Sequence, residues 1–153
     1  MNGQRGASGT MPLDNLYREL RIPQYSGTWG WSGRNEATNT VVFQIDSAKF
    51  REPTVLEKMS GIAIVHEFTA RDIESWRRTC REMNQRAPEH QTGWNLMRED
   101  LAFAYDQESC VRGAVFDSTH VGEEDGAWRL LPNLGQVVEF DRDTWTYRIV
   151  FFE

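Results

Sequence analysis

The sequence predicts an α+β domain in which a mainly antiparallel β-sheet is packed by one central amphipathic helix and preceded by a short N-terminal helix. Segments typical of strands outnumber helical ones, and short turns join most of them, which favours antiparallel pairing. One longer segment carries apolar residues at helical spacing. The chain has 153 residues, 39% of them hydrophobic, so it can bury a core as a single domain over residues 13–153.

The N-terminal part is expected to contain a tail and then a helix. Residues 1–12 are rich in small and polar side chains and carry one charge, which predicts a flexible tail. Apolar residues then recur at helical spacing, with Asp14 as a candidate N-cap. The helix must end before Pro23, because a proline disfavours the helical conformation of the residue before it.

The middle of the chain predicts two strands and the central helix. Residues 40–45 and 61–68 are rich in β-branched and other apolar side chains, as strands are. A helix is expected over residues 70–86, where apolar side chains recur at intervals of three and four. Thr69 and Asp72 resemble a capping box at its start, with aspartate in place of the usual glutamate or glutamine.

The remainder of the chain reads mostly as short strands, apart from a helical turn near 54–59 and a short helix or long connection over 89–100. A four-residue hairpin loop is expected at 141–144. The predicted strands cover residues 101–105, 111–116, 128–131, 137–140 and 145–152. The predicted core residues are Ile64, Ile73, Trp76, Met83, Phe103, Val115, Val138 and Ile149.

The negative charge is concentrated at one end of the sequence. The net charge is −6, and residues 101–153 account for all of it, with four basic and ten acidic side chains. Carboxylates on a surface are suited to contact a basic partner, although a solvated acidic surface is the simpler explanation. The candidate contacts to a partner lie in two predicted turns and are Glu123, Glu124, Asp125, Asp141 and Asp143.

This acidic end supports the leading hypothesis, a non-enzymatic protein-binding module that masks a basic surface of its target. A bacterial or phage accessory protein of the immunity or inhibitor type would act in this way. The expected partner is a protein with a basic surface. The sequence leaves the identity of that partner and the oligomeric state open.

A second candidate site is the aromatic, glycine-rich segment near residue 30. Tyr25, Trp29 and Trp31, with Arg34 nearby, would form a platform for stacking on a base or a cage for a cation. Tryptophans in a domain of this size also serve in core packing. The alternative function is therefore a domain that reads a modified or flipped nucleobase, although the net negative charge disfavours nucleic acid.

An enzyme is the third hypothesis, because the sequence lacks the motifs of a phosphate-binding loop or a nucleophile elbow. A catalytic site would require His66, His90 or His120 to meet acidic residues in a pocket. No cofactor and no metal is predicted. The absence of a long apolar run or a secretory leader, together with only two cysteines, predicts a cytoplasmic protein without a membrane contact.

Overall fold

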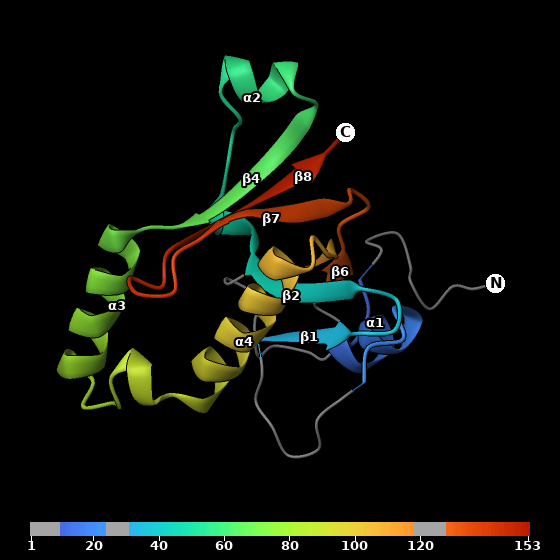
Figure 1. Ribbon diagram of the computed structural model, residues 1–153. Helices are drawn as coiled ribbons and strands as arrows, with labels where there is room; N and C mark the ends of the chain where they lie inside the picture. The colour runs from blue at the N-terminus through green and yellow to red at the C-terminus, as the bar shows by residue number, and fades with distance from the viewer. Residues whose placement is uncertain (1–9, 24–30, 118–127) are drawn as a thin grey trace.

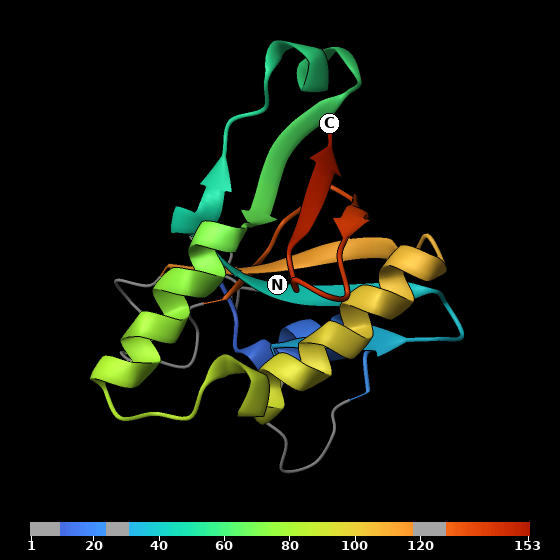
Figure 2. The ribbon, with the colours of Figure 1, turned by 60° about the vertical axis from the view of Figure 1, so that its left-hand side comes forward.

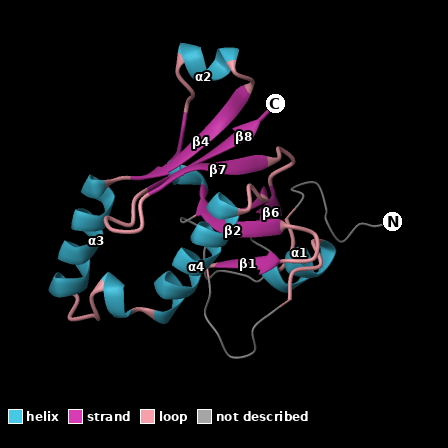
Figure 3. Cartoon of the chain, viewed as in Figure 1, coloured by secondary structure: helices cyan, strands magenta, loops and turns pink. Residues whose placement is uncertain are grey.

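The computed structural model describes residues 10–23, 31–117 and 128–153, and within them it shows one mixed, mostly antiparallel sheet with helices packed on it (Figures 1 and 3). The α+β prediction is confirmed. The strands are β1 (Ser32–Asn35), β2 (Thr40–Asp46), β3 (Phe50–Arg51), β4 (Ile62–Phe68), β5 (Cys110–Phe116), β6 (Arg129–Leu130), β7 (Gly135–Phe140) and β8 (Tyr147–Phe152). The helices are α1 (Leu13–Glu19), α2 (Val55–Met59), α3 (Ala70–Glu82) and α4 (Thr92–Asp106), with 3-10 turns η2 (Ser47–Lys49) and η3 (Pro88–His90).

The sheet has the strand order β1-β2-β5-β7-β8-β4-β3, and β6 pairs with β5 outside this path. Strands β2 and β5 are parallel, whereas the other neighbours are antiparallel. Parallel neighbours need a crossover, and here residues 47–109 supply it. As a result, the C-terminal ends of β2 and β5 lie at the same edge of the sheet.

The sheet is narrow where its two halves join. Strand β7 meets β5 at the pair Val111 and Gly135, and beyond this point β5 pairs with β6 instead. A Cβ atom on Gly135 would lie 2.6 Å from a ring carbon of Phe151, so only glycine fits at this junction. From the junction the two halves diverge: in Figure 2, β4 and β8 run steeply across the direction of β2.

Helix α4 packs on one face of the sheet, against β7, β1 and β2. Its buried face consists of Trp94, Met97, Leu101 and Ala104, at intervals of three and four residues. The predicted strand at 101–105 is therefore wrong. The helical spacing of buried residues that begins at Trp94 continues through this segment.

Helix α3 is shorter than predicted and lies beside the sheet, leaving directly from the end of β4 (Figure 1). Its capping box is confirmed: the Thr69 hydroxyl accepts the Asp72 amide, and the Asp72 carboxylate accepts the Thr69 amide at 2.7 Å. Only Ile73 and Cys80 are buried along its length. The helix expected to cover the sheet therefore serves mainly as a wall at its side.

The core agrees with the prediction at six of eight positions. Three residues are buried, and three are half-buried and pack against the core, namely Ile73, Val115 and Ile149 in the first group and Ile64, Trp76 and Phe103 in the second. Met83 is 61% exposed because α3 ends before it. Val138 is 38% exposed because it follows the buried Val137, and neighbouring residues of a strand point to opposite faces. The predictions that Met83 and Val138 lie in the core were therefore wrong.

The N-terminal segment packs on the opposite side of β2 from α4. Leu16 of α1 is fully buried in a second, smaller core beside Val42. The helix follows Pro12 as its N-cap, which corrects the prediction of Asp14; the Asp14 carboxylate lies in the first turn, near the positive end of the helix dipole. Met11 is buried and pairs with Trp128, whereas residues 1–9 of the predicted tail lie outside the described residues.

The predicted helical turn near 54–59 is confirmed, since α2 forms there. The predicted hairpin loop at 141–144 is confirmed only in part: these residues connect β7 to β8, but β8 begins at Tyr147, so the connection covers 141–146 and is longer than four residues. In the described part of the chain, no helix combines the length and the apolar character that crossing a bilayer requires.

Candidate functional site

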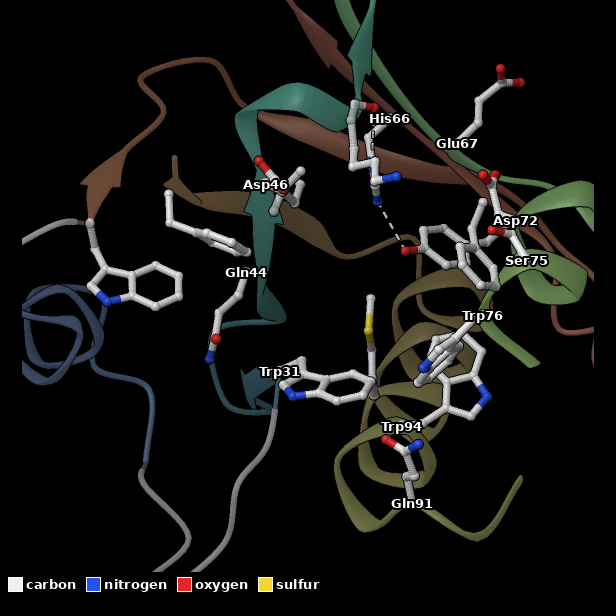
Figure 4. A pocket seen from close by; sticks show the side chains of 17 residues that line it. Trp31, Gln44, Asp46, His66, Glu67, Asp72, Ser75, Trp76, Gln91 and Trp94 are labelled. Atoms are coloured by element: carbon white, nitrogen blue, oxygen red, sulfur yellow. Dashed lines mark hydrogen bonds between the residues drawn. The ribbon is translucent and has the colours of Figure 1, made fainter. Parts of the chain in front are cut away.

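A cleft of about 640 Å³ lies at the edge where the two halves of the sheet diverge (Figure 4). The C-terminal ends of β2, β4 and β5, the start of β8 and the facing sides of α3 and α4 supply its walls. Divergence of the sheet opens this space, and the long crossover from β2 to β5 places α3 and α4 around it.

Large aromatic side chains are prominent in the walls, since seven of the 17 residues that line the cleft are Trp, Phe or Tyr. The Trp76 ring lies 5.4 Å from Trp94 in an edge-to-face arrangement and 5.6 Å from Trp31. Trp94 is the anchor of this group, since it is only 2% exposed and is held in the main core by α4. Such contacts between rings are worth about 0.5–1.5 kcal/mol each and hold the wall in place.

Two further aromatic pairs extend the walls. Phe68, at the end of β4, stacks on Tyr147 with ring centroids 5.6 Å apart. Phe116, at the end of β5, packs on Trp128 at 4.8 Å. The first pair belongs to one half of the sheet and the second to the other half, so aromatic surface is present on both sides of the cleft.

A buried hydrogen bond joins His66 to Tyr147 at the cleft, with 3.0 Å between Nε2 and the hydroxyl oxygen. The Nδ1 atom faces the carbonyl oxygen of Lys49 at 3.3 Å, which can only accept, so Nδ1 carries the proton and the Tyr147 hydroxyl donates to Nε2. Burial lowers the pKa of His66 and raises the pKa of Tyr147. Both groups are therefore neutral at pH 7.

Three carboxylates and one ammonium group line the cleft, namely those of Asp46, Glu67, Asp72 and Lys49. Asp46 accepts the amide of Ala48 at 3.0 Å and thereby caps the turn after β2. Asp72 uses Oδ2 in the capping box of α3. These short-range contacts hold the carboxylates of Asp46 and Asp72 in fixed positions at the cleft.

Glu67 differs from the other two carboxylates because arginines neutralise it. Its oxygens accept Arg51 Nε at 2.6 Å and Arg148 Nε at 2.9 Å, and Arg148 also contacts Glu139. The hydrogen bond from Arg51, together with that from Arg148, lowers the pKa of Glu67. In Figure 4 its side chain points away from the interior of the cleft. The charges left inside are thus Asp46, Asp72 and Lys49.

The predicted aromatic patch is only partly within the described residues. Trp31 lies in the cleft, across from His66 in the view of Figure 4, while Tyr25 and Trp29 lie outside the described residues. Arg34 does not line the cleft: its Nη1 donates to Asp100 at 3.0 Å, and its guanidinium lies over the ring of Phe103 at 5.0 Å.

Asp100, the partner of Arg34, is a buried carboxylate on α4. It also accepts the Ser32 hydroxyl at 2.6 Å, so it ties α4 to β1 from both oxygens. Burial raises its pKa, and the contacts with Ser32 and Arg34 oppose this rise only in part. This group therefore holds the fold together, and it is separate from the cleft.

The predicted acidic contacts lie elsewhere. Asp141 and Asp143 are exposed in the turn between β7 and β8, and they do not line the cleft. The Asp141 carboxylate accepts the amides of Asp143 at 2.8 Å and Thr144 at 3.1 Å, bonds that shape the turn and lower the pKa of Asp141. Glu123, Glu124 and Asp125 lie outside the described residues.

The histidines do not converge. His66 lines the cleft, whereas His90 is exposed in η3, and His120 lies outside the described residues. Among the residues that the structure describes, no group of three or more His, Cys, Asp or Glu side chains is arranged to hold a metal ion.

Most of the cleft has no direct signal in the sequence. The predictions of Trp76 as a core residue, of Asp72 in a helix cap and of a strand that includes Tyr147 are each correct locally. What joins them is the path of the chain, which brings the end of β4 and the start of β8 close to the start of α3.

Comparison with known proteins gives no family to which this site could be assigned, because no family model, no curated protein and no solved structure matches this chain significantly.

Proposed function

We propose that the protein is a non-catalytic binding module whose cleft receives a basic side chain of a protein partner. The observation that carries the proposal is the combination of aromatic walls with the fixed carboxylates of Asp46 and Asp72 in one cleft. Aromatic rings attract cations through their faces, and Trp, Tyr and Arg residues dominate the binding energy of protein interfaces.

The charges around the cleft favour a cationic ligand over an anionic one. With Glu67 neutralised by Arg51 and Arg148, the remaining charged groups that line the cleft are two carboxylates and one ammonium group. The whole chain carries a net charge of −6, which attracts a basic surface at long range. A protein that inhibits or protects a target by masking its basic site would use these features.

A binding role is favoured over catalysis by the state of His66. Its two ring nitrogens face the Lys49 carbonyl and the Tyr147 hydroxyl, so neither is directed at a substrate. A general base needs a nitrogen within hydrogen-bond reach of the proton that it removes. The histidine instead fixes the orientation of Tyr147 in the wall.

Reading of a nucleobase remains the second candidate, supported by the position of Trp31 in the cleft. Aromatic rings stack on bases. The carboxylates of the cleft would repel the phosphates of a nucleic acid, which is why this function ranks second.

The test is a titration followed by tryptophan fluorescence, since Trp31, Trp76 and Trp94 line the cleft. The probes are three short peptides of equal length and a single-stranded oligonucleotide. In the peptides, glycine alternates with basic residues (lysine and arginine), with glutamate, or with serine, which gives a basic, an acidic and a neutral peptide. The basic peptide is expected to change the fluorescence, and added salt is expected to weaken its binding.

Matched variants locate the site. Asp72→Asn removes a charge inside the cleft and is expected to lower the affinity for the basic peptide by up to about fivefold. Asp143→Asn removes one in the β7–β8 turn and should change little, since that residue lies outside the cleft. Equal binding of the basic and acidic peptides would overturn the proposal. So would a loss of binding to the basic peptide in Asp143→Asn but not in Asp72→Asn. Tighter binding of the oligonucleotide than of the basic peptide would favour the second candidate.

A further inference from the structure

We infer that the cationic group for which the cleft is suited is a methylated ammonium, such as the head of trimethyllysine. The inference rests on the proposed function and specifies its ligand. It follows from three features of the cleft: aromatic faces on both sides, rigid walls and few hydrogen-bond acceptors that are not already used.

The aromatic faces come from elements far apart in the sequence. Trp76 on α3 and Trp94 on α4 stand with Trp31, which precedes β1. Phe116 with Trp128 belongs to the half of the sheet that contains β5, and Phe68 with Tyr147 belongs to the half that contains β4 and β8. A cation between such faces is attracted by several rings at once. Aromatic cages of this kind recognise quaternary ammonium groups.

The walls are rigid before any ligand arrives. Trp94 is anchored in the main core, and Tyr147 is fixed from two sides, by stacking on Phe68 and by its hydrogen bond to His66. A cleft that keeps its shape does not have to order its side chains on binding, which lowers the cost of association. The opening therefore persists without a ligand inside, and its volume of about 640 Å³ exceeds that of one methylated ammonium group.

The shortage of acceptors selects among cations. An unmodified ammonium brings three N–H donors and a guanidinium brings five, and each donor that loses water needs a new partner. Here Asp46 accepts a backbone amide through Oδ1 and Asp72 accepts one through Oδ2, which leaves one oxygen on each, and Glu67 is held by two arginines. A trimethylammonium group has no N–H donor, so it loses its water at lower cost and keeps its attraction to the rings.

The carboxylates then add charge without a hydrogen bond. Burial and, after it, the negative charge of Asp72 raise the pKa of Tyr147, and both residues line the cleft. A cation there gains from this charge, whereas an uncharged group of the same shape does not. Charge and shape can therefore be separated experimentally.

The experiment compares three peptides that differ at one side chain: lysine, trimethyllysine and the uncharged carbon isostere of trimethyllysine, in which a tert-butyl group replaces the trimethylammonium. Binding to the full chain is measured by tryptophan fluorescence and by calorimetry. The trimethyllysine peptide is expected to bind about tenfold more tightly than each of the other two.

Variants of the cleft complete the test. Asp72→Asn is expected to lower the affinity for the trimethyllysine peptide and to leave the affinity for the uncharged isostere unchanged. Trp76→Phe is expected to retain more affinity for the trimethyllysine peptide than Trp76→Ala. Circular dichroism checks that each variant is folded.

Each outcome has a distinct meaning. If the lysine peptide binds as tightly as trimethyllysine, the inference is overturned while the proposed function stands. If the uncharged isostere binds as tightly as trimethyllysine, charge is irrelevant and the inference is overturned as well. If none of the three binds to the wild-type chain, the inference and the proposed function fail together.

Discussion

Helices α3 and α4 are similar in length but serve opposite purposes. Helix α3 has the capping box and the clear amphipathic pattern, yet it buries only Ile73 and Cys80 and presents Asp72 and Trp76 to the cleft. Helix α4 lacks a side-chain cap and has a weaker pattern, yet it supplies six buried residues and packs on three strands.

The difference teaches that the strength of an amphipathic pattern does not measure how much a helix buries. Helix α4 is covered on more than one face and therefore carries apolar residues on more than one face. Its amphipathic pattern is less clear for this reason. On α3 the apolar stripe is clear because the rest of the helix faces water, and part of that stripe forms the wall of a cleft. We therefore expect α4 to determine stability and α3 to determine binding.

The largest expected effect tests α4. Leu101 is fully buried, so Leu101→Ala is expected to lower the free energy of unfolding by about 2–5 kcal/mol. The matched substitution near α3 is Met83→Ala, whose side chain is 61% exposed, and a change within about 0.5 kcal/mol is expected. Urea unfolding measures both. Equal losses would remove the distinction between the two helices.

The second prediction concerns His66, which lines the cleft, and the pH dependence of the free energy of unfolding. Because burial lowers the pKa of His66, the folded state binds fewer protons than the unfolded state below pH 6.5. Its contribution to stability is present above pH 6.5 and is lost as the pH falls through the folded pKa, at up to about 1.4 kcal/mol per pH unit. His66→Gln is expected to flatten this dependence in urea unfolding between pH 7 and 5, and an equally steep dependence in the variant would contradict the prediction.

The cap of α3 should contribute less than the packing of α4. Thr69→Ala removes the hydroxyl that accepts the Asp72 amide and is expected to cost about 1 kcal/mol. Thr79→Ala, at an exposed position in the middle of the same helix, serves as control and should cost nothing, because alanine favours helix. If Thr69→Ala destabilised the protein as much as Leu101→Ala does, α3 would be as essential to the fold as α4.

The smallest effect has the opposite pH dependence and lies on α4. Burial raises the pKa of Asp100 above 3.8, so its contribution is present below pH 3.8 and is lost as the pH rises through the folded pKa. The stability of the wild type relative to Asp100→Asn is therefore expected to decrease as the pH rises from 3.8. The effect is small because Ser32 and Arg34 oppose the shift. An increase over that range would show that the contacts with Ser32 and Arg34 outweigh burial.

Most of the fold was predictable from local pattern. Strands at 40–45 and 61–68, the capping box at Thr69 and the turn at 141–144 depend on neighbours in the sequence, and all are present. The segment at 101–105 was not, because alternation over five residues fits a strand or a helix, and only its contact with the sheet decides.

The cleft was predictable only in fragments. Trp31 and His66 were singled out from separate hypotheses, and nothing in their spacing indicates that they face the same space. Their meeting depends on the order of the strands, since β8 lies between β7 and β4, and on the divergence at Gly135. Both are long-range properties that a single sequence does not reveal.

Strand β8 also governs the order in which the protein can fold while it is being made. Among the described strands, β3 and β4 are joined to the rest of the sheet only through β8. During synthesis β4 and α3 emerge early but have no place in the sheet until Phe152 has left the ribosome. We expect the nascent chain to depend on chaperones in this interval, because its unpaired strands and apolar faces are exposed.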